Sequence, residues 1–163
     1  MTEKFKLNYA TMCNPPDELH TQFDAALAKT RANLGQEYGM IIDGKDVFAG
    51  EKFEDRTPID ANVVLAVMQK GNQEHARLAM EAARKAFPAW SGMPWQERVR
   101  LLNKAADLME ERLFELSAAM SLEGGKNRME ALGDVQETAD LVRYACYQME
   151  KNDGFIVEMG RDP

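Results

Sequence analysis

Residues 95–127, WQERVRLLNKAADLMEERLFELSAAMSLEGGKN, carry an unusually regular helical pattern of apolar side chains. Apolar side chains recur in this run at steps of three and four, which is the period of an amphipathic helix. Ser91 and Pro94 precede the run and favour a helix start, while Gly124-Gly125 favour its end. The sequence therefore predicts one long helix, whose apolar stripe consists of Val99, Leu102, Ala106, Met109, Leu113, Leu116 and Met120.

Helices are also predicted on both sides of this run. Asn72 can cap a helix that continues to Phe87, where Pro88 is expected to stop it because proline has no N–H to donate. The apolar face of that helix holds Ala76, Ala79, Met80, Ala83 and Phe87. A further helix, from about Arg128 to Lys151, has a seam suited to packing against another helix. The seam consists of Leu132, Val135, Ala139, Val142, Cys146 and Met149.

The N-terminal half mixes one helix with short strands. Pro15-Pro16 favour a helix from Asp17 to Leu34, which Gly35 would end. A hairpin is predicted at residues 40–48 around the Asp43-Gly44 turn, followed by strands at 53–56 and 63–67, with Pro58 as a break. The predicted fold class is α+β, mostly helical, with a small antiparallel strand patch.

The end of the chain reads as the start of another strand, from Phe155 towards Pro163. A lone strand leaves backbone N–H and C=O groups unpaired, and two or three short strands are marginal without a cover. We therefore expect part of the surface to meet protein that this chain does not contain, either a continuation of the polypeptide or a partner subunit.

Composition excludes several classes of function. The chain has 163 residues and a formal net charge of −7, so it offers no general attraction to nucleic acid or anionic membranes. Residues 1–7 lack the apolar run of a signal peptide, and two cysteines cannot form a disulfide framework, so a cytoplasmic location is expected. With His20 and His75 as the two histidines, the common zinc geometries are excluded as well.

No self-sufficient catalytic site is predicted. Cys146 lies on an apolar seam, where burial makes a thiol inert, and Cys13 has no histidine nearby in sequence to activate it. The loop Gly124-Gly125-Lys126-Asn127 only imitates the end of a phosphate-binding loop, because Met120 stands where its first glycine belongs. Carboxylates such as Glu110 are expected to pair with arginines, most methionines to fill the core, and Trp90 and Trp95 to brace a helix corner.

The order of these segments carries a family resemblance. The hairpin with residues 42–45 (IDGK) is followed by residues 82–87 (AARKAF), 94–98 (PWQER) and 122–126 (LEGGK). Over roughly Ile41 to Pro163, this order resembles the N-terminal portion of the aldehyde dehydrogenase superfamily. The tail, with residues 144–150, 152–155 and 159–161, resembles the subgroup that oxidises glutamate semialdehyde, the pyrroline-5-carboxylate dehydrogenases. The helix before the hairpin fits that subgroup too.

The resemblance implies an architecture and a reaction for the full-length protein. Residues 1–38 would form an N-terminal extension and helix, and residues 39–163 the N-terminal segment of a dehydrogenase domain with the aldehyde-dehydrogenase-like α/β fold. The full-length enzyme would use a cysteine nucleophile and NAD or NADP to turn an aldehyde into an acid. The family's catalytic and dinucleotide-binding motifs lie beyond position 163, so we assign no catalytic, cofactor-binding or metal-binding residue here and expect no cofactor on this chain alone.

The resemblance also implies partners and one possible cation ligand. The expected partners are the rest of the dehydrogenase polypeptide or sister subunits in a homo-oligomer, with no nucleic acid and no membrane. This region would pack beside the dinucleotide-binding domain, and the strand near Phe155 would lead to the oligomerisation sheet. Glu123 matches a position that in some family members helps to bind a monovalent cation with carbonyls near Asp55 and Arg56; the alternative is a surface carboxylate at a helix end.

Three hypotheses about function remain open at this stage. The first is an N-terminal part of a glutamate-semialdehyde dehydrogenase that is inactive alone, used in proline catabolism. The second is a free-standing helical interaction or regulatory module, which a stop codon directly after Pro163 would favour. The third is a cysteine redox switch, which requires an accessible thiol of low pKa.

Overall fold

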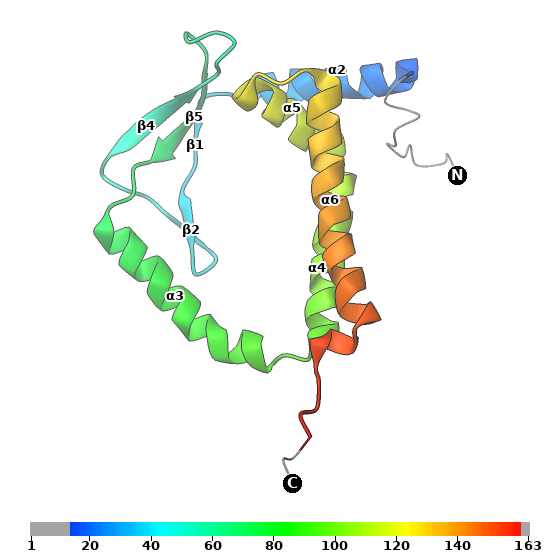
Figure 1. Ribbon diagram of the computed structural model, residues 1–163. Helices are drawn as coiled ribbons and strands as arrows, with labels where there is room; N and C mark the ends of the chain where they lie inside the picture. The colour runs from blue at the N-terminus through cyan, green and yellow to red at the C-terminus, as the bar shows by residue number, and fades with distance from the viewer. Residues whose placement is uncertain (1–13, 161–163) are drawn as a thin grey trace.

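A computed structural model describes residues 14–160 of the protein (Figure 1). Its helices are α2 (Asp17–Ala32), α3 (Gln73–Gly92), α4 (Trp95–Glu111), α5 (Leu113–Gly124) and α6 (Arg128–Lys151), followed by a 3₁₀ turn, η1 (Asp153–Phe155). The sequence inferences on residues 1–7, on Cys13 and on residues 161–163 lie outside the described residues. Within the described part, no helix is both long and apolar enough to cross a bilayer.

The strands form two small sheets. In the first, β5 (Val64–Gln69) lies between β1 (Gln36–Glu37), which is parallel to it, and β4 (Lys52–Arg56), which is antiparallel. The second is the predicted hairpin of β2 (Met40–Ile42) and β3 (Lys45–Val47), in which Asp43 and Gly44 both have positive φ. The predicted fold class, mostly helical with small antiparallel patches, is confirmed. Strand β1 was missed, because two residues are too short to show a period.

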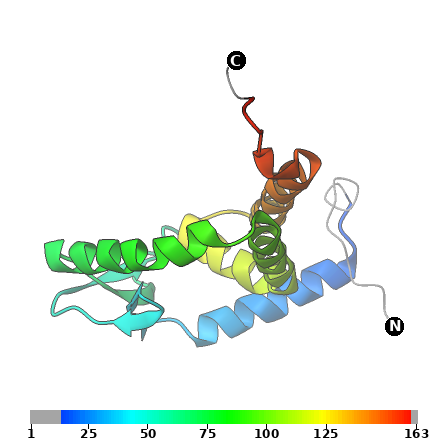
Figure 2. The ribbon, with the colours of Figure 1, turned by 90° about the horizontal axis from the view of Figure 1, so that it is seen from below.

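The helices provide the hydrophobic core. α2 packs against α5, and both α4 and α5 pack against α6, so α4, α5 and α6 form a column with α2 across one end (Figures 1 and 2). The predicted seam of α6 is confirmed, since Leu132, Ala139 and Cys146 are buried. The core cluster combines this seam with two other helices; its buried members are Leu19, Phe23, Leu113, Leu132 and Val135.

Two charged contacts fix α2 on this column. The guanidinium of Arg128, at the start of α6, pairs with the Asp24 carboxylate and donates from Nη1 to His20 Nδ1 at 2.7 Å. The same guanidinium lies 4.6 Å from the centroid of the Phe23 ring, a cation–π contact. Because Phe23 itself is buried in the core, this contact couples the docking of α2 to the start of α6.

The single long helix predicted from Ser91–Pro94 to Gly124 is wrong, because the helix divides at Arg112. Arg112 has φ −102° and ψ 18°, outside helical geometry, yet its N–H still donates to Leu108 and its carbonyl still accepts from Leu116. The backbone therefore changes direction without losing its hydrogen bonds. The bend brings Leu113 into the core that α5 shares with α2. The apolar stripe in the sequence does not reveal this packing.

The prediction that Pro88 stops its helix is also wrong, since α3 continues to Gly92. Proline cannot donate to the carbonyl four residues earlier, which belongs to Arg84. Arg84 and Pro88 are both exposed, so water can satisfy that carbonyl. The missing hydrogen bond therefore costs less free energy at this position than it would inside a packed core.

The strand predicted from Phe155 is not formed in residues 155–160. α6 is followed by η1, in which Gly154 and Phe155 both have positive φ, and Ile156 then returns to extended geometry. The extended backbone has no neighbouring strand among the described residues, so no ladder forms. The apolar side chains of this segment are exposed: the exposed fraction is 62% for Phe155, 70% for Ile156 and 78% for Val157.

Buried polar groups hold the three-stranded sheet together and join it to the helices. The amide of Gln69, which is buried, donates to Glu37 and to the Tyr38 carbonyl and accepts from the Ala49 N–H at 2.8 Å. The hydroxyl of Thr57, also buried, donates to the Leu122 carbonyl near the end of α5. Since buried polar groups must be paired, these contacts fix where the sheet meets the helical column.

Candidate functional site

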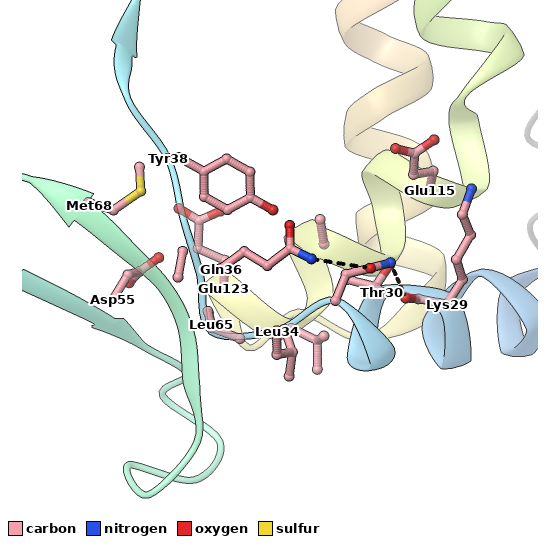
Figure 3. Close-up of a pocket in the computed structure, with 14 residues that line it drawn as sticks. Lys29, Thr30, Leu34, Gln36, Tyr38, Asp55, Leu65, Met68, Glu115 and Glu123 are labelled. Atoms are coloured by element: carbon pink, nitrogen blue, oxygen red, sulfur yellow. Dashed lines mark hydrogen bonds between the residues drawn. The ribbon is translucent and has the colours of Figure 1, made fainter. Parts of the chain in front are cut away.

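A pocket of about 390 Å³ lies where α2, the three-stranded sheet and α5 meet. Figure 3 shows that Lys29 and Thr30 come from the end of α2, Tyr38 from the chain after β1, and Glu115 and Glu123 from α5. The lining combines these polar groups with an apolar surface made of Leu34, Leu65, Ala66, Met68, Ala119 and Leu122. Three segments far apart in sequence thus form one concave site.

Charge in this pocket is distributed unevenly. At the helical side, the Arg112 guanidinium beside Glu115 lowers the pKa of that carboxyl, and the charge of Lys29 adds to the effect. Asp55 and Glu123, two residues that the cation hypothesis names, both line the pocket (Figure 3). The described residues contain no group of three or more His, Cys, Asp or Glu placed to hold a metal. A cation-binding role for Glu123 stays a prediction.

The remaining pocket residues were missed by sequence reasoning. Lys29, Gln36 and Tyr38 belong to a helix end and the strand after it, and none stands in a motif. Lys29 comes near Glu115 because α2 packs against α5. The period of apolar residues shows which face of a helix is buried, but it does not show which other element packs against that face.

The glycine loop has a structural role, as the sequence predicted. Gly125 adopts left-handed geometry, φ 66°, at the end of α5. Asn127 caps α6 by accepting from the Glu130 N–H at 3.0 Å, and Lys126 pairs with Asp134. The side chains that a dinucleotide phosphate would need are therefore engaged in holding α5 to α6. The loop therefore serves to end α5 and to begin α6.

Cys146 is buried, with 2% of its surface exposed, and its thiol faces the Val99 carbonyl of α4 at 3.8 Å. Burial raises the pKa of this thiol above its ordinary value of 9.0, and the charge of Glu150 raises it further. A thiol of raised pKa without solvent access is a poor nucleophile. The predicted core role of Cys146 is confirmed.

This burial predicts the chemical behaviour of the thiol. In a Cys13→Ser variant, which leaves Cys146 as the single thiol, we expect alkylation by iodoacetamide at pH 8 to be slower by at least about 100-fold than in the urea-unfolded chain. Because folding raises the pKa of Cys146, the stability contributed by its buried neutral thiol is present below pH 9. That contribution is lost as the pH rises above 9. Fast native alkylation, measured by mass spectrometry, would revive the redox-switch hypothesis.

The other candidate groups also have structural partners. Glu110 accepts from Arg143, which bridges α6 to α4 by pairing with Asp107 as well, so the carboxylate prediction is confirmed there. Trp95 supports the corner at which α4 meets the end of α6, where it lies directly against Gly154. Trp90 contributes through its carbonyl, which accepts from Arg98, while its side chain is 45% exposed.

The pocket offers polar and apolar surface, but its described lining lacks the parts of a covalent catalyst. None of the described residues that line it is a cysteine or a histidine. A nucleophile and its base must lie within hydrogen-bonding reach of each other, and the described residues provide no such pair in this pocket.

Comparison with known proteins connects this architecture to one family. Residues 47–162 match the model of the aldehyde dehydrogenase family. The 1-pyrroline-5-carboxylate dehydrogenase of Geobacillus sp. (strain WCH70) is 38% identical over 137 residues, which are 83% of this chain and 27% of that protein. The 1-pyrroline-5-carboxylate dehydrogenase 2 of Bacillus subtilis (strain 168) is 36% identical over 127 residues, 78% of this chain and 25% of that protein.

Solved structures with a similar fold belong to the same group of dehydrogenases. A structure of Thermus thermophilus 1-pyrroline-5-carboxylate dehydrogenase superposes with a TM-score of 0.87 and 32% identity. The match covers 100% of this chain and 32% of that one. This chain therefore spans about a third or less of the length of the relatives it matches. On the strength of the sequence match and the shared fold, the chain belongs to the aldehyde dehydrogenase family.

Proposed function

We propose that this chain is the N-terminal section of a dehydrogenase that oxidises glutamate semialdehyde to glutamate, and that it is catalytically inactive alone. The observation that carries the proposal is the superposition of the whole chain on 32% of the Thermus thermophilus enzyme at a TM-score of 0.87. The family relatives named above are 1-pyrroline-5-carboxylate dehydrogenases, which supports that substrate for the full-length protein.

In this proposal the chain is a scaffold. Residues 1–38 form an extension whose helix docks on α5, and residues 39–163 begin the dehydrogenase domain. The nucleophile, the base and the nucleotide contacts come from the remaining polypeptide. A Thermus relative was solved with bound NAD, which favours NAD over NADP as the cofactor of the full-length protein. We further propose that the full-length protein works in the cytoplasm as a homo-oligomer in proline catabolism.

The proposal is tested by restoring the missing part. The 163-residue chain is joined to the last two-thirds of the Thermus thermophilus enzyme, beginning where the structural match ends. We expect the lengthened protein to reduce NAD⁺ when glutamate semialdehyde is added, as measured by NADH absorbance. The matched control is the same Thermus segment without this chain, which we expect to be inactive because it lacks the scaffold.

Two outcomes would contradict the proposal. Equal activity of the Thermus segment without this chain would show that the scaffold is not needed. A folded lengthened protein that stays inactive, while the intact Thermus enzyme is active, would show that this chain is not the equivalent scaffold. The alternative, a free-standing helical interaction or regulatory module, is favoured by the exposure of α3, which has no buried residue. A stop codon directly after Pro163 in the gene would support that alternative.

A further inference from the structure

We propose that the docking of α2 on the helical column is sensitive to acid, and that His20 is the group that takes up the proton. The contact concerned joins His20 of α2 to Arg128 of α6, which lie 108 residues apart in sequence. The inference goes beyond the proposed function and does not depend on it, because it concerns the position of the N-terminal helix and not the reaction.

The contact between His20 and Arg128 fixes the protonation state of the imidazole ring. Nη1 of Arg128 lies 2.7 Å from Nδ1 of His20, within hydrogen-bonding distance. A guanidinium has N–H donors and no acceptor, and it keeps its proton at any ordinary pH. Nδ1 of His20 must therefore offer its lone pair. The ring is neutral when α2 is docked, and its one proton is on Nε2.

A second proton on this ring removes the contact. A protonated imidazole is a donor at both nitrogens, so Nδ1 can no longer accept from Arg128. Two positive groups would then face each other across the length of one hydrogen bond. Because the Arg128 side chain is 27% exposed, water screens this repulsion less than it would on an open surface.

Two carboxylates of α2 lie about one turn from His20 and act against this repulsion. Asp24 already pairs with Arg128, and its side chain is 62% exposed. Asp17, three residues before His20, is exposed to water as well. Once the ring is protonated, Asp24 has to balance two cations in place of one. Exposed carboxylates attract a neighbouring charge weakly, so we expect the repulsion from Arg128 to decide the sign of the effect.

The carboxylates on α5 and at the start of α6 belong to other contacts. They are Glu115, Glu123, Glu130 and Asp134. The first two line the pocket, at the end of α2 opposite to His20. The last two act on Lys126. Among the described residues of these two helices, Arg128 is therefore the charged group that faces His20.

Acid favours the undocked helix. Docked α2 holds the His20 ring neutral, whereas the ring of an undocked α2 takes up a proton as an ordinary histidine does. The undocked state therefore binds more protons as the pH falls, and the equilibrium shifts away from docking. Docking is strongest above the pH range in which histidines titrate, and it weakens below that range.

The hydrophobic core limits the size of this effect. Leu19 and Phe23, on either side of His20, are 1% and 3% exposed, so complete release of α2 would uncover both side chains. We therefore expect acid to increase local opening of α2 by about tenfold without detaching the helix. Since the end of α2 forms one wall of the pocket, each opening of the whole helix also removes that wall.

Hydrogen exchange at two pH values tests this inference. Amide exchange of the 163-residue chain is measured at about pH 7.5 and at about pH 5.5, on either side of the ordinary histidine range. Each rate is divided by the rate of an unstructured chain at the same pH. At the lower pH we expect the protection of α2 to fall by about tenfold relative to that of α6. Ordinary aspartates keep their charge at both pH values, so they do not produce this change.

Two matched substitutions identify the histidine that is responsible. His20→Asn keeps an oxygen acceptor for Arg128 but cannot take up a proton, so we expect the acid response of α2 to disappear. His75→Asn makes the same chemical change at the histidine that caps α3. We expect this control variant to keep the full acid response of α2.

The ring of His20 provides a second measurement, which does not depend on the folding of any variant. Nitrogen-15 NMR of the ring at about pH 7.5 is expected to show the proton on Nε2 and none on Nδ1. A proton on Nδ1 at this pH would overturn the inference. Unchanged protection of α2 at the lower pH, an equal loss in α2 and α6, or the same acid response in His20→Asn would overturn it too.

Discussion

Replacing Leu132 by alanine is expected to lower the free energy of unfolding by about 2–5 kcal/mol. Leu132 is fully buried on α6, in one core cluster with Leu19 and Phe23 of α2 and Leu113 of α5. Removing most of its side chain loses apolar burial and leaves a cavity that three different helices would have to collapse to fill. The change is measured by urea unfolding monitored by circular dichroism.

The matched control is Leu141→Ala on the same helix. Leu141 is 62% exposed, so its truncation is expected to change the free energy of unfolding by no more than about 0.5 kcal/mol. Both variants remove the same atoms from α6 and alter helix propensity equally. If the two variants lost equal stability, the core would not be where the structure places it.

Gly154→Ala is expected to disrupt the corner where α6 ends. Gly154 has φ 72°, and an added Cβ would lie 2.4 Å from Cδ1 of the Trp95 ring. Left-handed geometry costs an alanine about 1–2 kcal/mol, and the close contact adds about 1–3 kcal/mol unless the ring moves. We expect the fluorescence of Trp95 to shift and the last turn of α6 to lose protection from hydrogen exchange, with the core of α6 retained.

Gly50→Ala provides the comparison for this change. An added Cβ at Gly50 meets no atom within 4 Å, and the backbone there does not have the positive φ of Gly154. We expect neither the tryptophan fluorescence nor the exchange of α6 to change. Unaltered fluorescence in the Gly154→Ala variant would mean that Trp95 and Gly154 are not in contact in solution.

Local signals made part of this fold predictable. α6 was placed at its observed bounds because its apolar seam is long and regular, and Asn127 and Asn152 flank it. The β2–β3 hairpin followed from Asp43-Gly44, a dipeptide that tolerates the positive φ of the turn. The burial of Cys146 followed from its place on the seam.

Features set by tertiary contacts were not predictable in the same way. The bend at Arg112 depends on how α2 receives α5, and Pro88 is tolerated because its surroundings are solvent. The pocket needs segments near residues 30, 60 and 120 to meet, a requirement that no single stretch of sequence expresses. Periodicity predicted the apolar face of α3, but it could not show that residues 14–160 leave this helix without a buried residue.

If this chain is a scaffold without the reacting groups of the dehydrogenase, the homogeneous 163-residue chain should not turn over substrate. The decisive assay incubates it with NAD⁺ and glutamate semialdehyde and follows NADH absorbance over hours at high protein concentration. We expect no NADH above the rate of the blank without protein. Sustained NADH formation that scales with the concentration of the chain, and survives purification to a single intact mass, would show that the chain holds an active site of its own.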